Sequence, residues 1–348
     1  MKIDLFDYNL PPELIAQEQI KPRDHSRLLI LDRESKKIEH KKFYDLLDYL
    51  DQDDVLVLNE TKVFPARLFG KKQTGGKIEV FLTSQIKDNI WECMIGGKIK
   101  LNNKIYFDNL ECEVIKKLED KIYQVKFDKT GQELEKLIEQ IGQTPLPPYI
   151  KTQDSKKIKE DYQTIFAKSK GSVAAPTAGL HFTPELLKKL EAKNIKIFKI
   201  TLHVSLGTFA PVDVEDITKH KIHSEWASID QQTADELNKL KQQNKNIIAV
   251  GTTSARTLEA FADKNGQLEA GNKNINVYIY PGYKYKFVDD MITNFHLPKS
   301  SLLFMISALA GRELILDTYS QAIKLKYRFF SFGDAMFISK KRTLPAPR

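Results

Sequence analysis

Apolar and polar residues alternate in short runs between residues 67 and 128, with Gly, Asn and Asp between the runs. A period of two predicts strands with one buried face, and the intervening residues predict turns. Many short strands close together in the sequence indicate a small barrel. The runs are RLFGKK, KIEVFLTSQ, NIWECMIG, KIYFD, LECEVIKKLE and KIYQVKFD. A helical stretch and a proline-rich segment follow them, and we therefore place an inserted all-β barrel domain at residues 64–149.

Outside this insert, apolar runs typical of buried strands alternate with stretches whose apolar residues recur every three or four positions. This alternation favours an α/β fold with a largely parallel sheet or barrel. We predict a mixed or barrel-like α/β main domain formed by residues 1–63 and 150–348. A short helix is predicted in LPPELIAQEQ, strands from Leu28, in DDVLVLNETKV and at 195–205, 246–253, 274–280 and 327–339, and helices at 233–243, 256–264 and 300–311.

The stretch GSVAAPTAGLHFT, residues 171–183, carries no charge in a chain with 29% charged residues. It precedes a predicted helix in which Thr183 is the N-cap and Pro184 the first helical residue. Small residues allow a ligand close to the main chain, and helix N-termini favour anionic groups. We interpret the stretch as a ligand-binding loop that includes Thr177, with His181 as an acid, base or hydrogen-bond donor. A tightly packed turn with a capping histidine is the alternative.

A second candidate is AVGTTSARTLE, residues 249–259, where a predicted strand ends and a helix begins. Ligands of α/β proteins usually bind at the carboxyl ends of strands. Thr252, Thr253, Ser254 and Arg256 could therefore contact a ribose or a carboxylate. The hydroxyl groups could equally serve only to cap the helix, and the arginine could form a structural ion pair.

Three further segments contain residue types suited to catalysis or binding. They are TNFHLPKSSLL with Asn294 and His296, LHVSLGTFAPV followed by KIHSEW with His203 and Glu225, and YRFFSFGDAM, where Arg328 and Asp334 bracket a predicted aromatic strand. A metal site formed by the histidines and Glu225 is an open alternative. HExxH and paired Cys/His motifs are absent from the sequence, however, and we expect no metal.

Composition narrows the functional classes. The formal net charge of +8, with a pI of about 9.1, favours polyanionic partners. The sequence contains no apolar run of about 18 residues, so we expect no membrane span. The N-terminus lacks the cationic start and apolar core of a signal peptide, and we expect a cytoplasmic location. Cys93 and Cys112 have no metal-ligand spacing and are interpreted as buried free thiols.

Taken together, these stretches resemble the S-adenosylmethionine:tRNA ribosyltransferase-isomerase family of queuosine biosynthesis. The resemblance extends from Tyr8 to Met336, and departures at Lys62, Leu202, Ser205 and Phe332 remove no candidate functional group. The matching stretches are YNLPPELIAQ, RDHSRLL, LVLNETKVFPARLFG, TGGKIEVFL, GSVAAPTAGLHFT, HVSLGTFAPV, AVGTTSARTLE, TNFHLPKSSLL and YRFFSFGDAM.

The resemblance implies a reaction in which the ribosyl unit of S-adenosylmethionine moves to 7-aminomethyl-7-deazaguanine at the tRNA wobble position. The products would be epoxyqueuosine-tRNA, adenine and methionine. S-adenosylmethionine would be a cosubstrate, and no cofactor is expected. Catalytic roles fall to His181, His203 and His296. Substrate-binding roles fall to Thr177, Glu225, Thr252, Thr253, Ser254, Arg256, Asn294, Arg328 and Asp334.

The implied partners are tRNAs with GUN anticodons, specific for Asp, Asn, His and Tyr, and we expect a monomer. Two groups of lysines could contact phosphates, or they could be solvated surface charges. These are Lys71, Lys72 and Lys77 near the start of the insert and Lys156, Lys157 and Lys159 after it. A metal-dependent hydrolase and a non-catalytic RNA-binding protein are the alternative functions.

Overall fold

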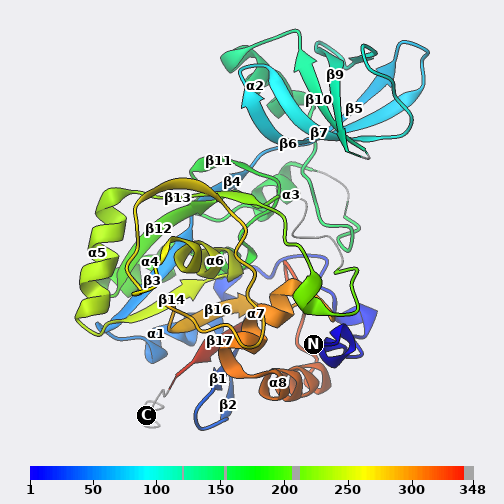
Figure 1. Cartoon of the computed structure of the whole chain (residues 1–348). Coiled ribbons are helices and arrows are strands. Elements are labelled where there is room, and N and C mark those ends of the chain that lie inside the picture. The colour runs from blue at the N-terminus through cyan, green and yellow to red at the C-terminus, as the bar shows by residue number, and fades with distance from the viewer. Residues whose placement is uncertain (120, 153–154, 206–211, 341–348) are drawn as a thin grey trace.

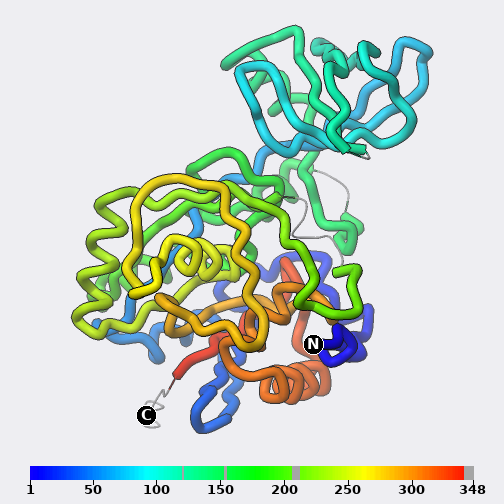
Figure 2. Tube along the Cα trace, viewed as in Figure 1, coloured from blue at the N-terminus to red at the C-terminus, as the bar shows by residue number. Residues whose placement is uncertain are grey.

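The computed structural model describes residues 1–119, 121–152, 155–205 and 212–340. Figure 1 shows two bodies, a smaller one built from strands and a larger one in which helices pack around a sheet. The tube in Figure 2 leaves the larger body once and returns to it once, and the first and last described segments of the chain belong to that larger body. The fold therefore has the predicted form of an α/β domain that carries an inserted barrel.

The larger body, here called the main domain, contains a mixed nine-stranded sheet. Its central strands β12, β3, β14 and β16 are parallel, and β17 and β1 are parallel to each other. The pairs β16–β17, β12–β13, β13–β15 and β1–β2 are antiparallel. The prediction of a largely parallel sheet therefore holds for the four central strands, and the sheet as a whole is mixed. In sheet order the strands are β15 (Gly271–Ile275), β13 (Glu225–Ile229), β12 (Lys196–Leu202), β3 (Asp54–Asn59), β14 (Asn246–Val250), β16 (Asp290–Asn294), β17 (Ala335–Ser339), β1 (Arg27–Asp32) and β2 (Ile38–Lys42).

Helices cover both faces of this sheet. In β3, Val55 and Val57 join one core with α5, α6, α7 and α8, while Leu56 and Leu58 join a second core with α1 and α4. Successive side chains of a strand point to opposite faces, so a strand buried on both sides is apolar at nearly every position. The helices are α1 (Leu46–Tyr49), α4 (Pro184–Ala192), α5 (Gln231–Gln242), α6 (Thr252–Phe261), α7 (Ser301–Ala310) and α8 (Arg312–Lys324). Short 3₁₀ helices lie at η1 (Ile3–Phe6), η2 (Pro12–Leu14), η3 (Arg23–His25), η4 (Phe43–Asp45), η5 (Thr177–His181) and η7 (Ile217–Lys219).

The smaller body is a closed six-stranded barrel with its own core, and this confirms the predicted all-β insert. Cys93 and Cys112 are buried free thiols in that core, as predicted. The limits 64–149 stay a prediction. In barrel order the strands are β10 (Ile122–Phe127), β7 (Ile90–Gly96), β6 (Lys77–Lys87), β5 (Arg67–Lys72), β8 (Lys104–Tyr106) and β9 (Glu111–Glu119), and α2 (Gly131–Ile141) follows them.

The two bodies are joined where the chain enters and leaves the barrel. Arg67 and Gln143 exchange both backbone hydrogen bonds, at 3.2 and 2.9 Å. Below them β4 (Thr61–Val63) pairs in parallel with β11 (Ser169–Ser172), and α3 (Lys156–Asp161) lies beside this pair. The entry and exit segments are therefore neighbours over several residues.

Three local predictions are wrong. The predicted strand 327–339 begins only at Ala335, because Asp334 accepts the backbone N–H groups of Arg27 and Arg328 and holds the preceding residues in a turn. The strand predicted at 274–280 ends at Ile275. The helix predicted in LPPELIAQEQ is reduced to the three residues of η2. In addition, helix α8 was missed, although Ile315, Tyr319 and Ala322 give it an apolar face.

Candidate active site

A cavity of about 340 Å³, here called the central cavity, lies at the carboxyl ends of β12, β14 and β16. All five segments singled out in the sequence contribute to its wall. They do so through Ala174–Ala178, Val204 with Val212, Gly251–Thr253, Thr293–Ser300, and Phe330 with Ser331. Among the described lining residues, Lys299 alone carries a formal charge. Residues 206–211 of the HVSLGTFAPV stretch lie outside the described residues.

Helix α6 begins at this cavity. Its N-cap is Gly251, with φ +91°, and no side chain caps the helix. Thr252 and Thr253 line the cavity, and the buried Thr253 hydroxyl has no hydrogen-bond partner among the described residues. A helix N-terminus combines free N–H donors with the positive end of the helix dipole. The start of α6 is therefore suited to an anionic or hydroxyl-bearing ligand.

His296 is the histidine of the central cavity. Its Nε2 lies 2.8 Å from Thr293 Oγ1, and its backbone N–H donates to the Tyr319 hydroxyl at 2.9 Å. The Tyr8 hydroxyl donates to its carbonyl oxygen. Burial lowers the pKa of His296 to about 3 because the charged form loses its hydration. The ring is therefore neutral at physiological pH, and Nδ1 has no partner among the described residues.

His181 lies behind the cavity wall and is not one of its lining residues. Its Nε2 accepts from the Asn294 amide at 3.1 Å, and its Nδ1 lies 2.7 Å from Ser26 Oγ. The same amide also donates to the Phe330 carbonyl, which fixes the amide orientation. Burial lowers the pKa of His181 to about 4. Asn294 itself lines the cavity, and its buried Oδ1 has no partner among the described residues, so His181 reaches a ligand only through Asn294.

His203 belongs to a different cavity, of about 660 Å³, between the barrel and the main sheet. Its Nδ1 lies 2.8 Å from Thr61 Oγ1, and its ring stacks on Trp226 with centroids 4.8 Å apart. Burial lowers the pKa of His203 to about 4. The three predicted catalytic histidines are therefore not brought together, and only His296 lines the central cavity.

Some of the other predicted binding residues line the central cavity, and the rest lie outside it. Thr177 joins Thr252, Thr253 and Asn294 in the central cavity. Glu225 and Arg256 form a buried ion pair, and Glu225 also lines the larger cavity. Ser254 donates to the carbonyl of Val250, the last residue of β14. Asp334 pairs with Arg27 and Arg328 outside the lining of the central cavity.

Sequence analysis missed an aromatic pair that lines the central cavity. Tyr149 and Phe330 stack with centroids 4.5 Å apart, and the Tyr149 hydroxyl lies 2.8 Å from Ser331 Oγ. Burial raises the pKa of Tyr149 to about 12, so the hydroxyl stays protonated. Tyr149 closes the proline-rich exit from the barrel, and that position was the only available signal.

The described residues contain no group of three or more His, Cys, Asp or Glu side chains that could hold a metal ion. His220 and His223 line a small cavity with Glu225, but Glu225 is already paired with Arg256. Within the same described ranges, no helix is long and apolar enough to cross a membrane.

Comparison with known proteins gives consistent results over the whole chain. The family model described as queuosine biosynthesis protein matches residues 3–338. The S-adenosylmethionine:tRNA ribosyltransferase-isomerase of Acetivibrio thermocellus is 51% identical over 345 residues, which is 97% of this chain and 100% of the relative. The protein of the same name from Thermosipho melanesiensis is 50% identical over 341 residues, with the same coverage of 97% and 100%. The crystal structure of the Thermotoga maritima S-adenosylmethionine tRNA ribosyltransferase is 35% identical, covers 96% of this chain and 99% of its own, and gives a TM-score of 0.56.

Proposed function

The chain belongs to the queuosine biosynthesis protein family, and we propose that it moves the ribosyl unit of S-adenosylmethionine to a tRNA base, with S-adenosylmethionine bound in the central cavity. Its full-length relatives are enzymes named for this activity. The observation that supports this placement is the lining of the cavity, which is almost uncharged and contains the start of α6 and a neutral histidine. Ligand sites of this kind are concave, mostly apolar and equipped with a few convergent polar groups.

The start of α6 holds the anionic end of the cosubstrate. The methionine carboxylate accepts from the free N–H groups of the first turn and from the Thr253 hydroxyl, which is otherwise unpaired. The unpaired Oδ1 of Asn294 accepts from the adenine amino group or from a ribose hydroxyl. His181 is a positioning residue here, because its Nε2 accepts from the Asn294 amide and so fixes where Oδ1 points.

The sulfonium of S-adenosylmethionine acidifies the neighbouring C5′ hydrogens, so the reaction begins when a base removes one of them. His296 suits this step because its ring is neutral and lines the cavity. Thr293 fixes the ring through Nε2, which leaves Nδ1 to accept the proton. The aminomethyl group of the tRNA base bonds to the ribosyl unit, and adenine and methionine depart. The modified base is then epoxyqueuosine.

This reaction is tested by adenine release from S-adenosylmethionine in the presence of tRNA that carries 7-aminomethyl-7-deazaguanine. His296→Ala should lower kcat by about 10²- to 10⁴-fold, the usual contribution of general acid–base catalysis. Thr253→Ala should instead raise the KM for S-adenosylmethionine. His25→Gln removes an exposed imidazole and should change neither constant. Unchanged turnover in a folded His296→Ala chain would exclude the proposed base.

The chemistry uses side chains alone, so we propose that neither a metal nor a redox cofactor takes part. Turnover should persist after dialysis against a strong chelator, and loss of activity that zinc restores would favour the hydrolase alternative. We further propose GUN-anticodon tRNAs as acceptors and a monomeric enzyme, to be tested with the four tRNA species and by light scattering.

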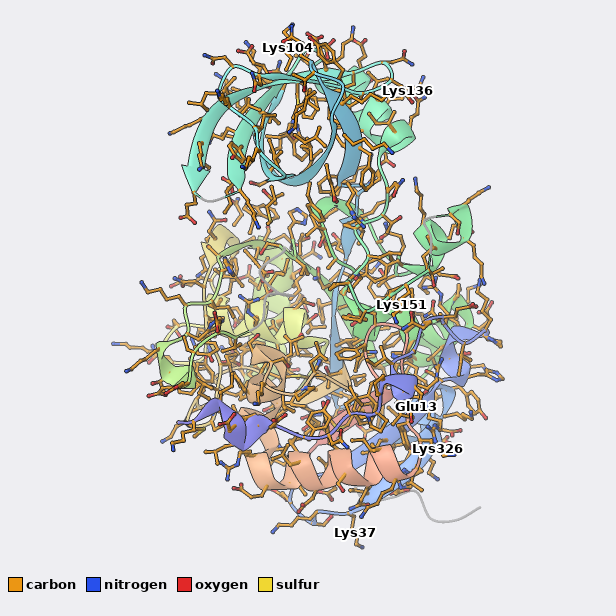
Figure 3. The ribbon with its side chains drawn as sticks, turned by 90° about the vertical axis from the view of Figure 1, so that its right-hand side faces the viewer. Glu13, Lys37, Lys104, Lys136, Lys151 and Lys326 are labelled. Atoms are coloured by element: carbon orange, nitrogen blue, oxygen red, sulfur yellow. The ribbon has the colours of Figure 1, made fainter. Side chains whose placement is uncertain are left out.

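Surface charge alone does not locate the tRNA. The labelled lysines in Figure 3 extend from the far side of the barrel, at Lys104 and Lys136, to the opposite end of the molecule, at Lys37. Lys157 pairs with Glu18, and the Lys72 ammonium donates to the carbonyl of Lys98. A contact surface for RNA therefore has to be sought in features other than net charge.

A further inference from the structure

Both tryptophans of the chain line one cavity, the space of about 660 Å³ between the barrel and the main sheet. Trp91 comes from β7 of the barrel and Trp226 from β13 of the main domain. Figure 1 shows the barrel above the end of the sheet that carries β12 and β13. This space is here called the interdomain cavity. Of the residues to which the sequence analysis assigns a role, His203 and Glu225 line this cavity.

Trp226 is held rigidly while part of its indole remains open to solvent. The side chain is 39% exposed, and its ring stacks on His203 with an interplanar angle of 16°. The His203 ring is itself fixed by Thr61 and by the close approach of Gly171, where a Cβ would lie 2.6 Å from Nε2. An indole supported on one side and exposed on the other is the kind of surface on which unpaired nucleobases stack.

Trp91 offers a hydrogen-bond donor on the opposite side of the cavity. The residue is 9% exposed, and its buried Nε1 has no acceptor among the described residues. Buried donors nearly always have partners in folded proteins, so an unpaired one indicates a missing ligand or water. A carbonyl oxygen on the edge of a nucleobase would satisfy it.

The charges of the interdomain cavity favour a base over a phosphate. Four carboxylates line it, whereas its single ammonium, from Lys170, lies between two of them at 3.8 and 3.3 Å. Carboxylates repel phosphate, but they accept hydrogen bonds from guanine-type N–H groups and attract an aminomethyl cation. The four are Glu92, Glu135, Glu139 and Glu225.

Phosphates have a separate place next to this cavity. A neighbouring cavity of about 440 Å³ contains three cations, Arg23, Lys62 and Lys159, against two carboxylates, Glu139 and Glu160. It shares Phe64, Pro65 and Glu139 with the interdomain cavity. In single-stranded RNA a phosphate lies beside each base, so the phosphates could contact these cations while the base enters the aromatic cavity.

The interdomain cavity and the central cavity adjoin each other. Val204 lines both, and Gly171 and Ala174, three positions apart, line one each. The Val173 N–H donates to the Val204 carbonyl at 3.0 Å, and the Val204 N–H donates to Ser172 Oγ at 2.9 Å. The two segments at this junction are therefore bonded to each other, and ligands in the two cavities would be neighbours.

We propose that the interdomain cavity holds the acceptor base of the tRNA, unstacked from its loop and stacked on Trp226. Trp91 Nε1 and Glu92 face the edge of the base, and the phosphates lie against Arg23, Lys62 and Lys159. This assignment rests on the proposed transfer reaction and adds to it the site of the second substrate and a role for the barrel.

Tryptophan fluorescence tests this assignment directly, because both indoles lie at the proposed site. The full-length Trp91→Phe chain loses the proposed Nε1 donor but keeps the stacking ring, and its indole emission comes from Trp226 alone. An anticodon stem-loop RNA with 7-aminomethyl-7-deazaguanine at the wobble position should quench this emission. The same RNA with an abasic wobble nucleotide should not, and S-adenosylmethionine alone should not. Equal quenching by both RNAs, or by neither, would refute the stacked base.

Steady-state kinetics provides the second test. Trp226→Ala should raise the KM for tRNA by about 10- to 100-fold, as expected for the loss of one base–aromatic stack, with the KM for S-adenosylmethionine unchanged. Phe69→Ala removes an aromatic side chain that is 50% exposed on the barrel and is outside the cavity lining, so it should have no effect. An unchanged KM for tRNA in Trp226→Ala would refute the site while leaving the reaction intact. If the parent chain releases no adenine at all, it is the proposed reaction that fails.

Discussion

Acidification should destabilise this protein through two buried imidazoles. His181 and His296 are 2% and 7% exposed, and burial lowers their pKa values to about 4 and about 3. In the unfolded chain each ring has the ordinary value of about 6.5, so at pH 5 the unfolded state binds protons that the folded state does not. Stability is therefore complete above pH 6.5 and is lost as the pH falls towards 4.

The size of this effect follows from the proton linkage. Between about pH 8 and about pH 5, one imidazole with a folded pKa near 4 and an unfolded pKa near 6.5 removes about 2 kcal/mol of unfolding free energy. The two rings together remove about 4 kcal/mol, a large part of the stability of a typical domain.

Urea unfolding at the two pH values measures this loss. A His181→Gln chain should lose about 2 kcal/mol less than the parent between pH 8 and pH 5, because it lacks one of the two linked protons. The comparison of variant with parent cancels the contributions of all other titrating groups. His25→Gln removes an exposed imidazole and should keep the parental difference. If His181→Gln also keeps it, the argument from burial is wrong.

Two other substitutions test local packing. Gly171→Ala should destabilise the fold by about 1–3 kcal/mol, since φ is +143° and the new Cβ would meet the His203 ring. Thermal unfolding measures this loss of stability. The KM for tRNA should also rise, because the His203 ring that supports Trp226 would have to move. Glu225→Gln should cost about 3–5 kcal/mol, because it leaves the Arg256 guanidinium buried without a counter-charge. As a control, Glu79→Gln removes a partly exposed carboxylate from its ion pair with Arg67 and should lower the unfolding free energy by less than about 1 kcal/mol in the same urea assay. Equal losses for the two variants would contradict this reasoning.

The elements that the sequence predicted well are those set by local chemistry. Thr183 caps α4 by accepting from the Leu186 N–H at 3.2 Å, and Pro184 begins the helix, as the sequence indicated. The barrel strands follow the period of two because one face of each strand is buried. In YRFFSFGDAM, by contrast, the predicted strand is wrong before Ala335, because the aromatic residues there are buried in a turn.

The loops that form the candidate site could be predicted from the sequence, but the role of each residue in them could not. His181 and His296 both follow uncharged stretches, and nothing local distinguishes them. Their positions depend on partners far away in the chain, since Ser26 lies 155 residues and Asn294 lies 113 residues from His181. The placement of Trp91 and Trp226 in one cavity was equally inaccessible, because one belongs to the barrel and the other to the main domain.

The double hydrogen bond between Arg67 and Gln143 also bears on how such a molecule can arise. Because the entry and exit segments of the barrel meet at this pair, inserting the barrel costs the main domain almost no loop-closure entropy. A short peptide joining the two segments would leave the strand order of the main domain untouched. The same paired segments connect the barrel to the main domain, so a change in the tilt of the barrel would alter the distance between Trp91 and Trp226 while leaving the central cavity in place.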